Sequence, residues 1–511
     1  MRPITKKLTI MLICMVLLAS VVLSACDTGT EDTSKPDTTS TESSYGNAHG
    51  GYNATTGKYY VNMPAFTWND KNEFRVLVYD NTQATTYFSE EIGVDKYETT
   101  DQAINEAVRE RNNVVFETYG VEVVAVYASN VNTDLQNDVL AGTGAYDAAM
   151  PYFSGAASLA QAGALYNLAD ERFAPYIDFS MPWWDQNATD SLSIDGKVFF
   201  TTGDISFMQK IVSVAVTFNK QMLADNHPDV NLYDMVKAGD WTLDQMVTLS
   251  KAVTIDNDGE TGFTYKDQWG LSGSYGDAAM LYLASGERLA TKNANDFPIL
   301  AIGGQRSINV AQKILQNLQL ANEWVVHANE FGTPDIWVTS LDIFGENRSL
   351  FRTSAFSAIK KLRQYGNDFG VIPMPKFDTE QDQYYTPCSA TLAFGIVIPV
   401  SAPDPEYSAY LIEVMSCEAK NRIPEAYYNT VLKGKDMRDD ESEEMLDNYI
   451  FNNVVYDLGL IYNFGGSASG VSSMFNFLMT NKSSDIASTL DSRKDAIEAA
   501  IDEVVAKYQS S

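Results

Sequence analysis

The stretch that decides the fold is Phe74-Arg75-Val76-Leu77-Val78-Tyr79. It is followed by a helical pattern over residues 101–119 and by a second apolar run over residues 121–127. The first run is rich in β-branched and aromatic residues and ends at the turn residues Asp80 and Asn81, which is typical of a β-strand. Apolar residues then recur at helical spacing up to Gly120. A strand, a helix and a strand joined in this way predict a parallel pair with a right-handed crossover. The sequence therefore predicts an α/β protein.

A second unit of this kind covers residues 141–155. A glycine-rich loop leads into a short apolar strand, and Pro151-Tyr152-Phe153-Ser154-Gly155 forms the turn after it. In open α/β sheets, ligands bind beyond the carboxyl ends of the strands. We therefore expect Tyr152 and Phe153, together with Asp80 and Asn81, to contact a ligand. For Asp80 the alternative is a turn residue that bonds to its own backbone.

The first 25 residues have the pattern of an export signal. Arg2, Lys6 and Lys7 give a positive start, residues 8–22 are apolar, and Leu23-Ser24-Ala25-Cys26 places small residues before a cysteine. A membrane-spanning helix is the alternative, but it usually needs about 18 or more apolar residues. The ending resembles the bacterial lipobox, in which the signal is cleaved before a cysteine that then receives lipid. We expect residues 1–25 to be removed and Cys26 to carry the lipid, palmitate included, on the extracytoplasmic face of the cell membrane.

Residues 26–56 are expected to form a disordered tether behind that cysteine. They are mostly Thr, Ser, Asp, Glu, Gly and Asn. Such a segment cannot bury enough apolar surface to offset its ordering entropy.

The whole chain is strongly acidic. Its 511 residues carry a formal net charge of −31, and loss of residues 1–25 would remove positive charges only. This charge argues against nucleic acid and anionic lipid head groups as partners and favours a neutral or cationic ligand. With 45% hydrophobic residues, the chain is long enough to build two domains with a core each.

The chain has four cysteines: Cys14 leaves with the signal and Cys26 is the expected lipid attachment point, which leaves Cys388 and Cys417. In an extracytoplasmic compartment they could form a disulfide, and the alternative is a pair of buried free thiols. The sequence leaves both alternatives open.

Several motifs follow one another in a distinctive order. They are 103–112 (AINEAVRERN), 142–147 (GTGAYD), 182–185 (PWWD), 196–200 (GKVFF), 231–236 (NLYDMV), 239–244 (GDWTLD), 348–351 (RSLF) and 369–375 (FGVIPMP). In this order, and together with the lipobox, the chain resembles the bacterial extracellular solute-binding proteins of the family that includes maltodextrin-binding protein. The resemblance covers essentially the whole predicted mature body.

The resemblance implies a two-lobed, periplasmic-binding-protein-like α/β fold of class II. Each lobe would hold a mixed, mainly parallel sheet flanked by helices, and the ligand would lie in the cleft between the lobes. Lobe 1 would comprise residues 72–203 and about 388–460, and lobe 2 residues 214–373. A C-terminal helix over residues 484–508 would lie across both.

Further ligand-binding residues follow from the same resemblance. Sugar sites pair aromatic rings with a few directed hydrogen-bonding groups. Tyr275, in Gly273-Ser274-Tyr275-Gly276-Asp277, matches a loop that supplies a stacking ring in the relatives, and Ser354 and Phe356 lie where the relatives place another. For Tyr275 and Phe356 the alternative is packing in the core or at the cleft rim.

The implied function is that of a substrate-binding lipoprotein of an ABC importer. It would be a monomer that captures an oligosaccharide or a related small solute by hinge closure and delivers it to the permease subunits, without cofactor, metal or catalytic residues. A glycoside hydrolase is one alternative, because two carboxylates suffice for that chemistry. A sensor or adhesin subunit that binds glycans is another.

One segment is rich in oxygen ligands for calcium, Asp256-Asn257-Asp258-Gly259-Glu260 with Asp267 beyond it. An EF-hand needs glycine at the sixth position, where this chain has Thr261. The sequence favours a solvated loop, with no metal.

Overall fold

The computed structural model describes residues 45–510, apart from 47–48, 68–70, 81–90, 95–101, 207–211, 321–322, 363 and 428–438. The predicted signal segment, Cys26 and Asn81 lie outside the described residues. Among the helices in these ranges, none has the length and apolar character needed to cross a membrane.

The predicted strand, helix and strand are confirmed. They are β4 (Glu73–Tyr79), α2 (Gln102–Tyr119) and β5 (Glu122–Ala128), and β4 and β5 pair in parallel. The short strand β6 (Ala148–Ala149) pairs in parallel with the other edge of β4, which gives the order β5-β4-β6. Helix α2 buries the apolar face that the spacing predicted, including Ile104, Val108 and Val115.

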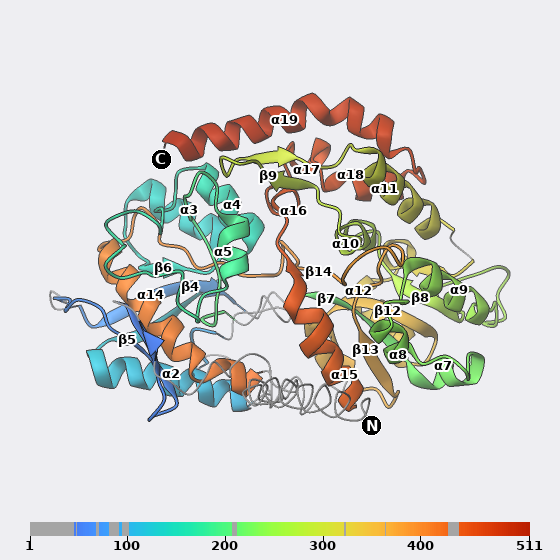
Figure 1. Cartoon of the computed structure of the whole chain (residues 1–511), viewed down its shortest axis with the longest axis horizontal. Coiled ribbons are helices and arrows are strands. Elements are labelled where there is room, and N and C mark those ends of the chain that lie inside the picture. Colours follow the sequence, from blue (N-terminus) through green and yellow to red (C-terminus); the bar gives the residue numbers. More distant parts are fainter. Residues whose placement is uncertain are drawn as a thin grey trace, which may run out of the picture. The chain divides into compact units, whose positions relative to one another are not determined.

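Further helices complete lobe 1 around this sheet. They are α3 (Val131–Ala141), α4 (Phe153–Gln161), α5 (Gln186–Leu192) and α14 (Pro405–Lys420). Helix α14 packs beside α2, although about 300 residues separate the two in sequence. The chain therefore returns to lobe 1 after it has built lobe 2 (Figure 1).

Lobe 2 is built on a five-stranded sheet with the order β11-β8-β12-β7-β13. The strands are β7 (Val214–Asn219), β8 (Trp269–Gly273), β11 (Val325–His327), β12 (Ser349–Ala355) and β13 (Phe369–Ile372). Strands β11, β8 and β12 are parallel, whereas β7 is antiparallel to both β12 and β13. The sheet is therefore mixed, and its three parallel strands end at one edge.

Helices and short elements surround this sheet. They are α7 (Lys220–Asn226), α8 (Leu232–Lys237), α9 (Leu243–Val253), α10 (Asp277–Ala284), the hairpin β9 (Ala290–Lys292) and β10 (Pro298–Leu300), α11 (Gln305–Leu318), the 3-10 turns η1 (Ala328–Glu330) and η2 (Phe356–Ala358), α12 (Ile336–Gly345), α13 (Ile359–Leu362) and α15 (Asp440–Met445). Trp241 and Trp269 are buried in this lobe.

The remaining elements connect the lobes or lie over both of them. They are β14 (Thr386–Pro387), η4 (Leu446–Ile450), η5 (Phe451–Asn453), β15 (Val454–Val455), α16 (Leu458–Tyr462), α17 (Gly466–Ser469), α18 (Ser473–Thr480) and α19 (Ile486–Ser510). Helix α19 contacts α4 of lobe 1 as well as α11 and β10 of lobe 2 (Figure 1). Tyr508 near its end packs edge-on against Phe199 and lies in hydrogen-bond contact with Tyr462.

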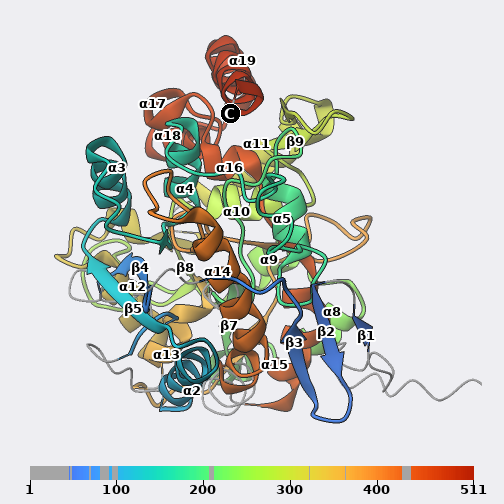
Figure 2. The ribbon, with the colours of Figure 1, turned by 90° about the vertical axis from the view of Figure 1, so that its left-hand side faces the viewer.

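The predicted tether ends earlier than expected. Residues before 56 already form a small antiparallel sheet of β1 (Tyr45–Gly46), β2 (Gly50–Asn53) and β3 (Lys58–Val61), and β3 packs beside α14 (Figure 2). The backbone N–H of Tyr59 donates to Asn421 at 2.8 Å, and the Asn421 amide donates back to the Tyr59 carbonyl at 3.0 Å. Contacts with a distant helix order a segment whose composition alone predicted disorder.

Candidate functional site

The carboxyl edge of the lobe 1 sheet carries a stack of three aromatic rings. Tyr79 is the last residue of β4, and Tyr152 lies between β6 and α4. Their ring centroids are 4.2 Å apart, and Phe394 stacks 5.0 Å from Tyr152. Phe394 is fully buried, whereas both tyrosines are partly exposed. Burial raises the pKa of Tyr79, so that its hydroxyl stays protonated and can donate a hydrogen bond.

Asp80 directly follows Tyr79 of this stack in the sequence. It is half-buried, and its backbone N–H donates to the carbonyl of Ala128 at 2.8 Å. This bond continues the pairing of β4 with β5 by one residue, and it holds Asp80 at the carboxyl edge of the sheet.

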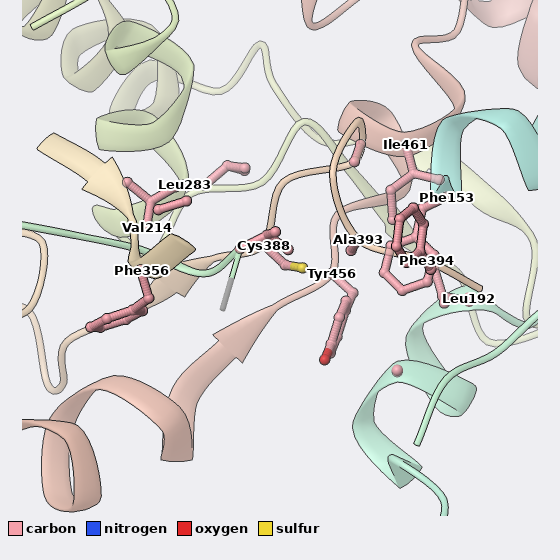
Figure 3. Packing of buried hydrophobic residues seen from close by; sticks show 14 of the residues in the cluster. Phe153, Leu192, Val214, Leu283, Phe356, Cys388, Ala393, Phe394, Tyr456 and Ile461 are labelled. Atoms are coloured by element: carbon pink, nitrogen blue, oxygen red, sulfur yellow. The ribbon is translucent and has the colours of Figure 1, made fainter. Parts of the chain in front are cut away.

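Two of the expected ligand residues lie in the core instead. Phe153 is fully buried, with its ring 6.0 Å from Phe200 and 5.9 Å from Tyr456. Phe356 is 1% exposed and packs 5.3 Å from Phe451. Figure 3 shows both rings among other buried side chains. Neither ring has an exposed face, so we assign both a packing role.

At the carboxyl edge of the lobe 2 sheet, Tyr275 joins the loops after β8 and β11. Its backbone N–H donates to Asn329 at 2.8 Å, and its hydroxyl donates to the Glu330 carboxylate at 2.7 Å. Its ring contacts His327 edge-on at 5.2 Å. Burial and the Glu330 carboxylate raise the pKa of Tyr275 to about 12. Tyr275 is thus held in place and partly exposed.

Asp277, two residues after Tyr275, links α10 to β12 by hydrogen bonds. Its carboxylate accepts hydrogen bonds from the backbone N–H of Ser274 and from the Thr353 hydroxyl, both at 2.7 Å. Burial raises the pKa of Asp277. The next hydroxyl along β12, that of Ser354, is buried and has no hydrogen-bond partner among the described residues. Ser354 therefore offers an unused donor and acceptor near the end of β12.

Residues 388–394 join these two edges. Cys388 bridges to Ser213, whose neighbour Val214 pairs with Ala355 at the end of β12, while Phe394 bridges to Tyr152. Six peptide steps span at most ~20 Å. The segment is in fact folded back, since the Ala393 N–H donates to the Ser389 carbonyl. The aromatic stack of lobe 1 and the polar edge of lobe 2 are therefore held close together, with this segment between them. Figure 3 shows Cys388, Ala393 and Phe394 of the segment.

The two cysteines do not form the disulfide that the sequence left open. Both Cys388 and Cys417 are free and buried. One follows β14 in the connection between the lobes and the other lies within α14. Burial raises the pKa of both thiols, which keeps them protonated.

In the acidic loop, backbone N–H groups of the loop itself bond to the central carboxylate. Asp256, Asp258 and Asp267 lie close enough to share a cation. However, the Asp267 carboxylate accepts hydrogen bonds from the backbone N–H groups of Asn257, Asp258 and Thr264 at 2.7 to 2.8 Å. These three hydrogen bonds explain why the Asp267 carboxylate lies at the centre of the loop, and we assign no metal to the loop.

Three aromatic residues of these edges were not among the sequence candidates. Tyr79 and Phe394 form the stack with Tyr152, and Trp337 is 58% exposed in the first turn of α12, the helix that follows β11 and η1. Asp335 caps this helix by accepting from the N–H groups of Trp337 and Val338. A capping residue soon after an apolar strand is a signal that could have pointed to Trp337. No local signal marks Phe394, because its partners Tyr152 and Tyr79 lie more than 240 residues earlier.

Together these groups are suited to binding. Rings with an exposed face can stack on an apolar surface, and the hydroxyl and carboxylate groups can fix the polar edges of a ligand.

The comparisons with known proteins agree with the fold. A family model described as bacterial extracellular solute-binding protein matches residues 110–423. A cyclo/maltodextrin-binding protein complexed with maltotetraose superposes with a TM-score of 0.52 at 15% identity, covering 86% of this chain and 98% of that chain. An ABC substrate-binding protein of Listeria monocytogenes in complex with cycloalternan gives 0.53 at 15% identity, covering 85% and 98%. A maltose/maltodextrin-binding domain of Bdellovibrio bacteriovorus bound to maltotriose gives 0.50 at 12% identity, covering 86% and 99%. A search of curated protein sequences finds no match.

Proposed function

The chain belongs to the bacterial extracellular solute-binding proteins, and from this we propose that it captures an oligosaccharide or a related small solute between its two lobes. The observation that carries the proposal is the aromatic stack of Tyr79, Tyr152 and Phe394 at the edge of lobe 1. Sugar rings have apolar faces and polar edges. A partly exposed pair of tyrosine rings matches the faces.

The edge of lobe 2 supports the same ligand class. The Ser354 hydroxyl is unused within the described residues, and the Glu330 carboxylate and the Tyr275 ring lie at the ends of neighbouring strands. The bound ligands of the three superposed proteins, maltotetraose, cycloalternan and maltotriose, are oligosaccharides. A ligand that contacts both edges is bound best when the lobes are closed, and this differential affinity would drive closure.

The proposal extends to transport. The family is one of binding proteins and its location is extracytoplasmic, so we propose a monomeric subunit of an ABC importer that hands its solute to the permease. Acylation of Cys26 would hold it at the membrane. Labelled palmitate should enter the protein in a bacterial host and be absent from a Cys26→Ala variant; equal labelling of the two would contradict acylation at this residue.

The binding site is tested by calorimetric titration with maltotetraose, cycloalternan and other oligosaccharides. Replacing Tyr152 with alanine removes a stacking surface worth about 0.5–1.5 kcal/mol, so affinity should fall about 2- to 12-fold. A Ser354→Ala variant should lose a similar amount, as one hydrogen bond contributes about 0.5–1.5 kcal/mol.

Tyr60 provides the matched control, because it is a tyrosine 42% exposed in the N-terminal sheet. Tyr60→Ala should bind as the wild type does. Unchanged affinity in both the Tyr152 and Ser354 variants would contradict this site. Cleavage of the titrated sugar, seen by chromatography, would contradict a pure binding function.

A further inference from the structure

A cavity lies between the lobes, and the residues that line it differ from those of the candidate site. Its volume is about 290 Å³, and its walls come from α5, from Arg288, from residues 383–385 and from residues 452–456. We call it the hinge pocket, because residues 386–387 and 454–455 are the paired connecting strands β14 and β15. None of Tyr79, Tyr152, Tyr275 and Ser354 lines it. Its size is at the lower end of the range for small-molecule sites, about 300–1,000 Å³.

Among the described residues, Arg288 is the only one with a charged side chain in this wall. Its guanidinium lies over the Tyr385 ring at 4.9 Å, and its Nη1 donates to the carbonyls of Leu283 and Glu287. Its Nε and Nη2 groups make no hydrogen bond within the described residues. The guanidinium is thus fixed in orientation while one edge of its donor fork stays available.

Two carboxylates lie near this guanidinium but outside the pocket wall. Asp457 accepts hydrogen bonds from the backbone N–H groups of Leu289 and Leu460, and Glu287 pairs with Arg306. Both also interact with the charge of Arg288. Among the described residues, no aspartate or glutamate lines the pocket. In a chain with a net charge of −31, a half-buried cation in such a wall is suited to an anion.

The other polar groups of the wall are the hydroxyls of Ser191, Tyr385 and Tyr456 and several carboxamides. Asn187 from α5 of lobe 1 donates through Nδ2 to the Val454 carbonyl at 2.8 Å, which turns its amide toward the connecting strand. Gln383 and Asn453 also line the cavity. Amide groups can bind the hydroxyls of a ligand whose carboxylate pairs with Arg288.

We propose that the hinge pocket is a second binding site, which takes a small hydroxylated carboxylate such as a sugar acid. It goes beyond the solute capture proposed above. Because its walls come from both lobes, from β15 and from the residues just before β14, its occupant stabilises the lobe arrangement in which those walls meet. Occupancy of the pocket therefore changes the affinity of the interlobe cleft for its own solute, and the reverse holds to the same degree.

Calorimetric titration of the purified protein with glucuronate, galacturonate and lactate tests the proposal. At least one of these should bind, and Arg288→Gln should weaken it about tenfold or more, while Arg288→Lys keeps part of the affinity. Arg172→Gln is the matched control, because that exposed arginine lies over Tyr166 at the same 4.9 Å but outside the pocket. Its affinity for the acid should equal that of the wild type.

Two further arms separate this site from the cleft. Tyr152→Ala should leave acid binding unchanged, and glucose should bind far more weakly than glucuronate. The proposal is overturned if none of the three acids binds, if Arg288→Gln binds the acid as tightly as Arg172→Gln does, or if Tyr152→Ala abolishes acid binding. If the wild-type protein binds an acid but no oligosaccharide, the proposed solute capture in the cleft is rejected and the proposal for the hinge pocket stands.

Discussion

At the scale of single residues, Glu413 is the side chain whose protonation matters most for the fold. It lies fully buried within α14, and the indole N–H groups of Trp183 and Trp184 donate to its two oxygens at 3.0 and 2.9 Å. Burial raises the pKa of Glu413 from 4.5 to about 8. In the sequence the two tryptophans stand out only as part of the motif 182–185 (PWWD), and no local signal marks their partner, which lies about 230 residues further on.

A pH dependence of stability follows. Below about pH 4.5 Glu413 is neutral in the folded and unfolded states, and between about 4.5 and 8 only the folded state keeps the proton. The stability contributed by the neutral group is therefore lost as the pH rises through this window. In urea unfolding, the difference in free energy between pH 5 and pH 8 should be smaller in Glu413→Gln than in the wild type, by about 1 kcal/mol or more.

The control for this change is Glu117→Gln, on an exposed position of α2. It should keep the pH dependence of the wild type. If Glu413→Gln also keeps the pH dependence of the wild type, the buried carboxyl of Glu413 is not the source of that dependence.

At the scale of elements, the hairpin of β2 and β3 allows a matched pair of substitutions. Tyr59 turns its ring toward Trp183, at 6.5 Å, whereas Tyr60 on the opposite face of the strand is 42% exposed. Tyr59→Ala should lower the free energy of unfolding by about 1–3 kcal/mol through lost burial. Tyr60→Ala should stay within about 0.5 kcal/mol of the wild type. Equal effects in urea unfolding would show that the hairpin does not pack on lobe 1.

The elements also show what the sequence could predict. The unit of β4, α2 and β5 was predicted to within two residues, because its periodicity and its turn residues are local. Tyr152 and Tyr275 could be placed at the carboxyl edges of the sheets because each follows a strand in a recognisable loop, and their contact with a ligand stays a prediction. The end of the tether was missed, because its order depends on Asn421, 362 residues from Tyr59. Phe394 was missed for the same reason.

At the scale of the whole molecule, α19 holds elements of both lobes together. Tyr508 is 1% exposed and contacts Phe199 and Tyr462. Tyr508→Ala should destabilise the protein by about 3–5 kcal/mol, as for other large aromatic residues in a core. Tyr508→Phe keeps the ring and should cost about 1 kcal/mol. Urea midpoints of the two variants check this order, and a Phe variant as unstable as the Ala variant would contradict a packing role.

Closure of the lobes is the motion on which the proposed function depends, and the chain allows a direct test. Cys388 and Cys417 are buried with raised pKa values, so in a protein that lacks residues 1–26, and with them Cys14 and Cys26, a maleimide dye should react with introduced cysteines alone. Leu140 in α3 and Val338 in α12 are 77% and 44% exposed. Dyes at Leu140→Cys and Val338→Cys report the distance between the lobes.

Energy transfer between these dyes should change as a binding oligosaccharide is added, because a ligand held by both lobes shifts the population toward the closed state. With Tyr152→Ala the change should need several times more ligand but reach the same end point, since the substitution weakens binding and leaves the closed geometry intact. A pair within lobe 1, Leu140→Cys with Glu106→Cys, should show no change. If the interlobe pair stays constant at saturating ligand, binding occurs without closure, and delivery to a permease would need a signal other than the distance between the lobes.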